Sequence, residues 1–352
     1  MANDFTANSF SNSGSFSNSN IRDPYEAEQN LKETTELFIR NNEILKSVLS
    51  ARDPRILMAC AVLFTSKGMR ADTLRLQTYQ GILRKRFGVF SSFRGMIEPF
   101  LLTNMVLHGS PERYLTEIEQ ISSMIGGWAE KEYSVLTAMI IAGQEDLSAA
   151  DAVARTRDLY SRMRALWPLI TSAEDLPQAA MLAVTGKAPE QLIADTQSCM
   201  ELLKRFAYKN ALQAISLSLG LIDEAPQAKC DRFRALYTAC QNHRIVFERG
   251  LGMAVPATLL LLDLPYDTTA KQIAQAAAIL QNTKGFGPAM TGGKATRNLF
   301  AAALVLIANT DVREEETSAA HAAAAFIIHL IQIEMAAVTS AVIAATLTAT
   351  TS

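Results

Sequence analysis

The sequence predicts an all-α protein built from α/α helical-hairpin repeats, stacked as an α-solenoid or closed into an α/α toroid. Short, strongly apolar segments recur at intervals of about 35 to 45 residues, a period typical of stacked repeats. Longer segments between them place apolar residues at three- and four-residue steps, as amphipathic helices do. Apolar and polar residues alternate nowhere for long enough to indicate a strand.

The composition of the 352 residues is that of a folded chain with an unusual start. Hydrophobic residues make up 49% and charged residues 19%, and the net charge of -2 excludes a generally basic nucleic-acid binder. Residues 1–22 are rich in Asn and Ser, so we expect them to form a disordered tail. We expect residues 23–352 to form a single all-α helical-repeat domain, whose first helix begins near Asp23 and Pro24.

The strongly apolar segments predict helices that are buried on every side. They begin near Ile56, Phe93, Tyr133, Leu176, Ala211, Gly252 and Asn298. The segments between them predict helices with one apolar stripe, which cover the buried ones. One such stripe comprises Leu192, Thr196, Cys199 and Leu203. A hairpin of the two kinds leaves apolar area that only neighbouring hairpins can cover, so we expect about six repeats to stack.

The last predicted helix is rich in alanine and runs from about Ala319 to Thr346. Its length would span a bilayer, but it contains His321, His329 and Glu334, and a charge within a membrane is costly. We therefore expect a buried capping helix, and a membrane anchor stays open as the alternative for this helix alone.

The four cysteines indicate a reducing compartment. Cys60, Cys199, Cys230 and Cys240 form no C-x-x-C pair and have no histidines at zinc-site spacing. We expect buried, reduced thiols, no metal, no cofactor and no catalytic residue. The N-terminus has no basic segment followed by an apolar one, so no secretory signal is expected and the cytoplasm is the predicted location.

Six residues are candidates for ligand binding. Arg94 lies one turn before Glu98, and a structural ion pair is the simpler interpretation. His243 follows an apolar stripe, which favours a hydrogen-bonded core histidine. Lys294 and Arg297 lie in the glycine-rich stretch 285–298, which is expected to be a loop and lacks the spacing of a P-loop. The sixth candidate, Glu334, lies in the Ala-rich helix.

Basic residues cluster in the stretch 67–94. They are Lys67, Arg70, Arg75, Arg84, Lys85, Arg86 and Arg94, against the single acid Asp72. Other cations gather at the ends of later amphipathic helices, where they complement the helix dipole. If these cations lined one face, they would form a groove for nucleic acid, an interpretation the sequence does not favour because aromatic residues are not interleaved with them.

Several motifs resemble a family of bacterial proteins of unknown function. They are FSSFRG (90–95), Y-x-x-M-R-x-x-x-P-L-I-T (160–171), EDLPQAAMLA (174–183), NALQAISLSLGL (210–221) and the closing MAAVTSAVIAATLTATTS (335–352). They are similar to the domain of unknown function with number four thousand and three. The resemblance implies a cytoplasmic bacterial protein and supplies no catalytic residues. Trp167 stands where the family pattern suggests a histidine.

Three functions follow from these observations. The first is a non-enzymatic scaffold that binds a protein or peptide on its concave face, since repeat arrays offer such surfaces. The second is a small-molecule-binding protein or enzyme with a central polar cavity, which requires at least three of the six candidate residues to converge. The third is nucleic-acid binding through a basic groove.

Overall fold

The computed structural model describes residues 24–49, 54–126, 131–142, 144, 147–248, 250–262, 264–287 and 293–310. Within these residues the chain forms fourteen α-helices and two short 3₁₀ helices, and no strand. The predicted all-α class is confirmed. The tail 1–22 and the Ala-rich helix with Glu334 lie outside the described residues.

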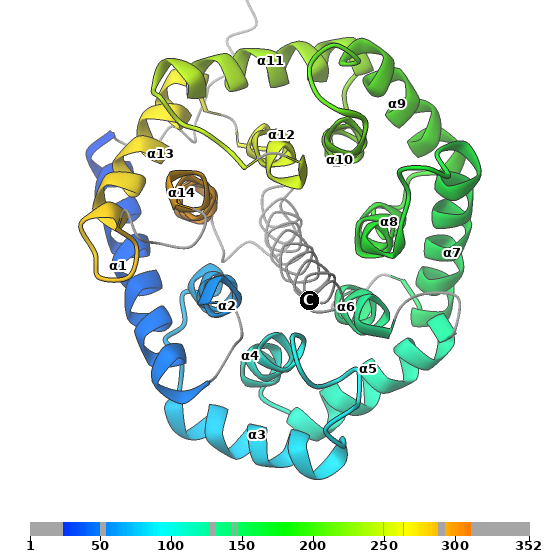
Figure 1. The fold of residues 1–352 in the computed structure, drawn as a ribbon, viewed down its shortest axis with the longest axis vertical. Coiled ribbons are helices and arrows are strands. Elements are labelled where there is room, and N and C mark those ends of the chain that lie inside the picture. The colour runs from blue at the N-terminus through cyan, green and yellow to red at the C-terminus, as the bar shows by residue number, and fades with distance from the viewer. Residues whose placement is uncertain are drawn as a thin grey trace, which may run out of the picture.

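Every second α-helix along the chain lies on the outside of the fold (Figure 1). These outer helices are α1 (Pro24–Val48), α3 (Thr73–Arg86), α5 (Pro111–Ile125), α7 (Ala149–Leu166), α9 (Pro189–Leu202), α11 (Pro226–Asn242) and α13 (Tyr266–Gln281). Each buries one stripe and exposes the opposite side. Five of them bury the residue that lies seven positions after the first residue of the helix, namely Ile118, Thr156, Thr196, Phe233 and Ile273.

The remaining helices lie inside the outer ones (Figure 1). These inner helices are α2 (Pro54–Ser66), α4 (Glu98–His108), α6 (Lys131–Ala142), α8 (Leu176–Ala183), α10 (Lys209–Leu219), α12 (Val255–Leu259) and α14 (Gly293–Asn309). All residues of α8 are buried, as are residues 211–219 of α10. Their apolar side chains point in every direction, so burial on all sides is the favourable arrangement.

The apolar segment that was predicted to open a helix near Phe93 begins its helix later, at Glu98. Gly95 has a φ of 71°, in the left-handed region that favours glycine, so a right-handed helix cannot pass through it. The Phe93 ring stacks on Phe87 with 4.3 Å between centroids. Residues 87–97 therefore form a compact connection between α3 and α4.

Contacts between inner helices show which of their ends lie together. Gln213, near the start of α10, donates to the Thr171 hydroxyl just before α8, over 2.8 Å. Lys187, just after α8, donates to the Gly220 carbonyl at the end of α10. Asn298, near the start of α14, donates to the Val246 carbonyl just before α12. The inner helices thus begin at one end of the molecule, here called the entry end, and finish at the other, called the exit end.

The first and last helices of the described chain pack together. Helix α1 contacts both α13 and α14 (Figure 1). The Phe38 ring of α1 lies 5.6 Å from the Phe286 ring and 5.9 Å from the Phe300 ring, measured between centroids. Near the exit end, the Asn30 amide of α1 donates to the Ala308 carbonyl of α14. Apolar packing and a polar contact therefore join the two ends of the helix series.

The four cysteines are buried and form no disulfide. Burial raises the pKa of Cys60 and of Cys240 to about 12, so these thiols stay protonated at neutral pH. Among the described residues, no helix has the length and apolar character needed to cross a bilayer.

Candidate functional site

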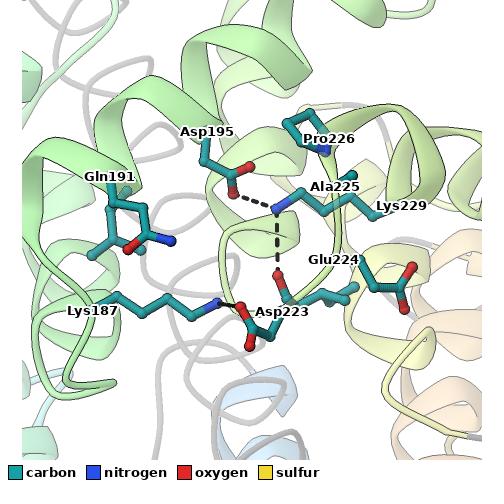
Figure 2. Close-up of a pocket in the computed structure, with 10 residues that line it drawn as sticks. Lys187, Gln191, Asp195, Asp223, Glu224, Ala225, Pro226 and Lys229 are labelled. Atoms are coloured by element: carbon teal, nitrogen blue, oxygen red, sulfur yellow. Dashed lines mark hydrogen bonds and ion pairs between the residues drawn. The ribbon is translucent and has the colours of Figure 1, made fainter.

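A cleft of about 400 Å³ opens at the exit end, between α9, α11 and the connections that precede them (Figure 2). Its charged and polar lining comprises Lys187, Gln191, Asp195, Asp223, Glu224 and Lys229. Leu192 and Ile222 supply an apolar floor. The cleft is thus a mixed surface with both signs of charge.

Lys229 is the buried cation of this cleft, with only 1% of its side chain exposed. Its ammonium group forms an ion pair with the Asp195 carboxylate on the neighbouring outer helix (Figure 2). It also donates to the Ile222 carbonyl at 3.4 Å. A buried charge needs such partners, because an unpaired ammonium would pay a large desolvation cost.

Packing alone does not explain why a lysine stands at position 229. Lys229 lies three residues after the first residue of α11. At the same position counted from their own first residue, four other outer helices bury uncharged residues, namely Tyr114, Ala152, Leu192 and Thr269. Replacing a buried ion pair with apolar groups is often neutral or stabilising. The charge at Lys229 is therefore a feature of this cleft rather than a requirement of the fold.

A second ion pair lies at the mouth of the cleft. The Lys187 ammonium is 3.4 Å from the Asp223 carboxylate, whose side chain is 92% exposed. Lys187 also donates to the Gly220 carbonyl at 3.4 Å, which fixes its position. A pair with one such exposed partner contributes little to stability, so an anionic group of a ligand can replace Asp223 at Lys187.

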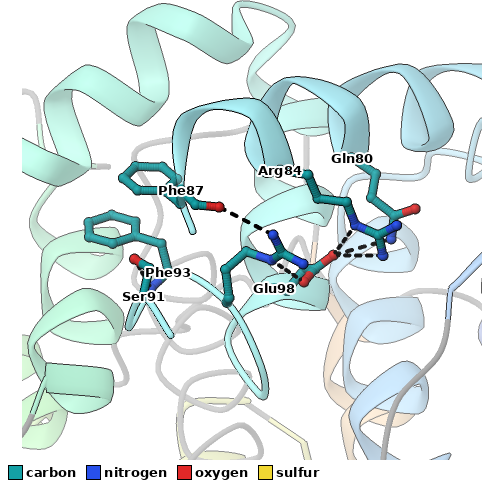
Figure 3. A network of polar contacts seen from close by, with 7 residues as sticks. Gln80, Arg84, Phe87, Ser91, Phe93 and Glu98 are labelled. Carbon is teal, nitrogen blue, oxygen red and sulfur yellow. Dashed lines mark hydrogen bonds and ion pairs between the residues drawn. The ribbon is translucent and has the colours of Figure 1, made fainter. Parts of the chain in front are cut away.

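A polar network surrounds Glu98 at the entry end (Figure 3). The Glu98 carboxylate pairs with Arg94 at 2.7 Å and with Arg84 at 3.3 Å. Arg94 also donates to the Phe87 carbonyl at 3.3 Å, so it bridges the connection 87–97 to the first turn of α4. Arg94 and Glu98 thus form the expected ion pair, and its partners give it a structural role.

The other predicted binding residues lie apart from this network. His243 was expected in the core, but it caps the C-terminus of α11 with 28% of its side chain exposed and lies 2.8 Å from Asp267. The stretch 285–298 was expected to be a loop, but α14 begins at Gly293 and includes Lys294 and Arg297. Arg297 is 6% exposed and donates to the Phe286 carbonyl at 3.0 Å, while Lys294 is exposed.

The basic stretch 67–94 does not form one patch. Lys67 and Arg70 lie between α2 and α3, whereas Arg84 and Arg86 lie in the last turn of α3. Arg86 pairs with Glu119 of α5 at 2.6 Å, in addition to the Arg84 pair with Glu98. The cations of this stretch are therefore divided between the two ends of α3.

Sequence reasoning missed Lys187, Asp195, Asp223 and Lys229. A signal for Lys229 was present, because it precedes Phe233 by four residues and so occupies the buried stripe of α11. A charged residue at a stripe position requires a partner, and Asp195 on the preceding outer helix supplies it. The contact depends on the register between α9 and α11, which is a tertiary property.

The fold and the cleft define an all-helical protein with outer and inner helices and a charged cleft at one end. Within the described residues, no group of three or more histidine, cysteine or acidic side chains is arranged to hold a metal ion. The chain belongs to the family described as "Protein of unknown function (DUF4003)", whose model matches residues 41–347. Neither a curated protein nor a solved structure matches it.

Proposed function

We propose that this protein is a non-enzymatic helical-repeat scaffold, a closed α/α toroid of seven hairpins, that binds a protein or peptide. The packing of α1 against α13 and α14 supports the closed ring (Figure 1). The four buried, unpaired thiols support a cytoplasmic location. Because α8 and α10 are buried on all sides, we assign binding to the cleft between α9 and α11 rather than to the concave face.

The observation that carries this proposal is the pairing of Lys229 with Asp195 in a stripe that is otherwise uncharged. The pair holds two charges at the base of the cleft, while the Lys187–Asp223 pair lies at its mouth. A bound peptide would place an acidic side chain against Lys187 and an apolar one over Leu192 and Ile222. A volume of about 400 Å³ accommodates a few side chains.

Selection of peptides from a random displayed library on the full-length protein tests the proposal. We expect enrichment of sequences that combine an acidic and an apolar residue. Their affinity should fall about tenfold in the double variant Lys187→Ala and Asp223→Ala, because the peptide carboxylate then has no lysine to pair with at position 187. Lys284→Ala, at the entry end, is the matched control and should leave binding unchanged. Failure to enrich any sequence, or equal loss in the control, would count against the cleft as a peptide site.

No observation favours the small-molecule or enzyme alternative. It required three of Arg94, Glu98, His243, Lys294, Arg297 and Glu334 to converge in one pocket. Of the five that the structure describes, only Arg94 and Glu98 contact each other.

A further inference from the structure

Exposed apolar side chains lie on several connections at the entry end. Val89, Phe90, Leu169, Tyr208 and Val246 are each more than half exposed, with Phe90 fully exposed and Leu169 at 93%. They come from four separate connections, 87–97, 167–175, 203–208 and 243–254, each of which joins an outer helix to the next inner one. Because the inner helices all begin at this end, the four connections project from the same side of the molecule.

Exposed cations lie on the same connections or next to them. The entry end exposes Lys85, Arg164, Arg205, Lys209, Arg244 and Lys284. They lie in the last turns of outer helices, in the connections or at the start of α10. None of the six is in an ion pair with another described residue, so these charges remain available to an anionic partner.

Acidic residues stand in the first turns of the outer helices, or just before them. They are Asp72, Glu112, Asp151, Glu190, Asp223 and Asp267. Two of these acids pair with the preceding outer helix, since Arg162 lies 2.6 Å from Glu190 and His243 lies 2.8 Å from Asp267. The six exposed cations of the entry end lie outside these pairs, so they keep a positive charge for an anionic surface.

We propose that the entry end is a docking surface for an anionic lipid bilayer. The exposed apolar side chains, here called the apolar tips, lie on separate connections with cations between them. The core of a protein interface is instead one contiguous apolar patch. Single apolar tips can each enter the interface of a fluid, flat bilayer while neighbouring cations contact phosphate head groups. The aliphatic tips Val89, Leu169 and Val246 suit hydrocarbon, whereas single-stranded nucleic acid is bound by aromatic stacking.

Vesicle co-sedimentation of the full-length protein tests this surface. We expect binding to vesicles of phosphatidylcholine and phosphatidylglycerol at roughly three to one, and at least ~10-fold weaker binding to phosphatidylcholine alone. The triple variant Phe90→Ser, Leu169→Ser and Tyr208→Ser should lose at least ~10-fold in affinity, as should Lys85→Glu with Arg205→Glu and Lys284→Glu. The matched controls at the exit end are Leu74→Ser and the pair Lys67→Glu with Arg113→Glu, which should bind like the parent protein.

Site-specific labelling reports which end of the bound protein faces the bilayer. All four native cysteines are buried, so Phe90→Cys and Leu74→Cys each supply one reactive thiol for an environment-sensitive dye. We expect a blue shift on addition of the anionic vesicles at position 90 and none at position 74. Equal shifts, or no binding by a protein whose helical circular dichroism is intact, would overturn the proposal. The proposal would also be overturned if the protein bound a duplex or single-stranded oligonucleotide more tightly than the vesicles and the serine variants left that affinity unchanged.

Discussion

Lys229 is a charged residue in the buried stripe of an outer helix. The matching places on four other outer helices hold uncharged residues, while Lys229 needs both Asp195 and the Ile222 carbonyl to stay buried. Its charge adds no apolar contact, so its contribution to stability depends on the partner carboxylate.

Removing one member of this pair should destabilise the protein. Lys229→Met leaves Asp195, whose side chain is 18% exposed, without its partner, and should lower the free energy of unfolding by about 3 kcal/mol. The double variant with Asp195→Leu should recover most of that loss, since neither charge then remains. Urea denaturation of the parent, both single variants and the double variant measures the coupling. Additive losses would mean that the ion pair has no special role.

Asp175 gives a stability that depends on pH. Burial raises its pKa to about 7, although the hydrogen bond from the Ser172 backbone N–H opposes the rise. The folded state thus keeps a proton that the unfolded state releases near pH 4, so this residue costs stability as pH rises from about 4 to about 7. Asp175→Asn should therefore gain stability relative to the parent across that window, by on the order of 1.4 kcal/mol per unit of pKa difference.

Denaturation of both proteins at several values of pH between 4 and 8 measures this difference. The reverse sign, with the variant losing relative stability as pH rises, would show that Asp175 is stabilised as a carboxylate instead.

At the scale of elements, the connection between α3 and α4 shows how polar contacts order a segment without regular structure. The rings of Phe87 and Phe93 stack, and Arg94 joins the Phe87 carbonyl to Glu98. The Arg94 and Glu98 side chains are 14% and 12% exposed, so solvent screens their attraction less than that of a surface pair.

Loss of Arg94 should loosen this connection. We expect Arg94→Gln to raise amide exchange in residues 87–97 by about tenfold, because the Phe87 carbonyl and Glu98 lose a shared charged donor. Hydrogen exchange with mass spectrometry measures it. Arg162→Gln is the matched control, since Arg162 also pairs with a residue one turn away, Asp158, but is 39% exposed. Equal effects of the two variants would rule out an ordering role for Arg94.

At the scale of the whole molecule, the proposed closed ring makes a prediction about unfolding through the contact of α1 with α13 and α14. An open array of repeats loses terminal units independently, whereas a ring couples each unit to two neighbours. Phe38 is fully buried between Phe286 and Phe300, so it joins the two ends directly.

Phe38→Ala should therefore weaken the molecule as a unit. We expect a loss of about 3 to 5 kcal/mol in the free energy of unfolding, because a large buried side chain is removed. If the proposed ring is closed, amide protection should fall in α8, on the opposite side of Figure 1 from α1, by the same free energy as in α1. Native-state hydrogen exchange compares the two helices. Protection lost in α1 but retained in α8 would indicate an open, independently unfolding array.

The sequence alone determined the helical class and the division between buried and covering helices. Apolar side chains on every side of the segment 176–183, or on one stripe of the segment 189–202, dictate local structure and burial because both follow from the helical period. The Arg94–Glu98 pair was also predictable, since four residues of separation bring side chains together in a helical turn.

Tertiary structure decided which side chains come together to form the sites. Lys229 meets Asp195 only because α9 and α11 pack in a particular register, and no short-range pattern specifies that register. The basic stretch 67–94 forms no single patch because a whole outer helix, α3, separates its two parts. Exposed tips such as Phe90 and Leu169, far apart in sequence, face the same side because the inner helices run parallel. Periodicity fixes what each helix buries, but helix packing decides which side chains meet.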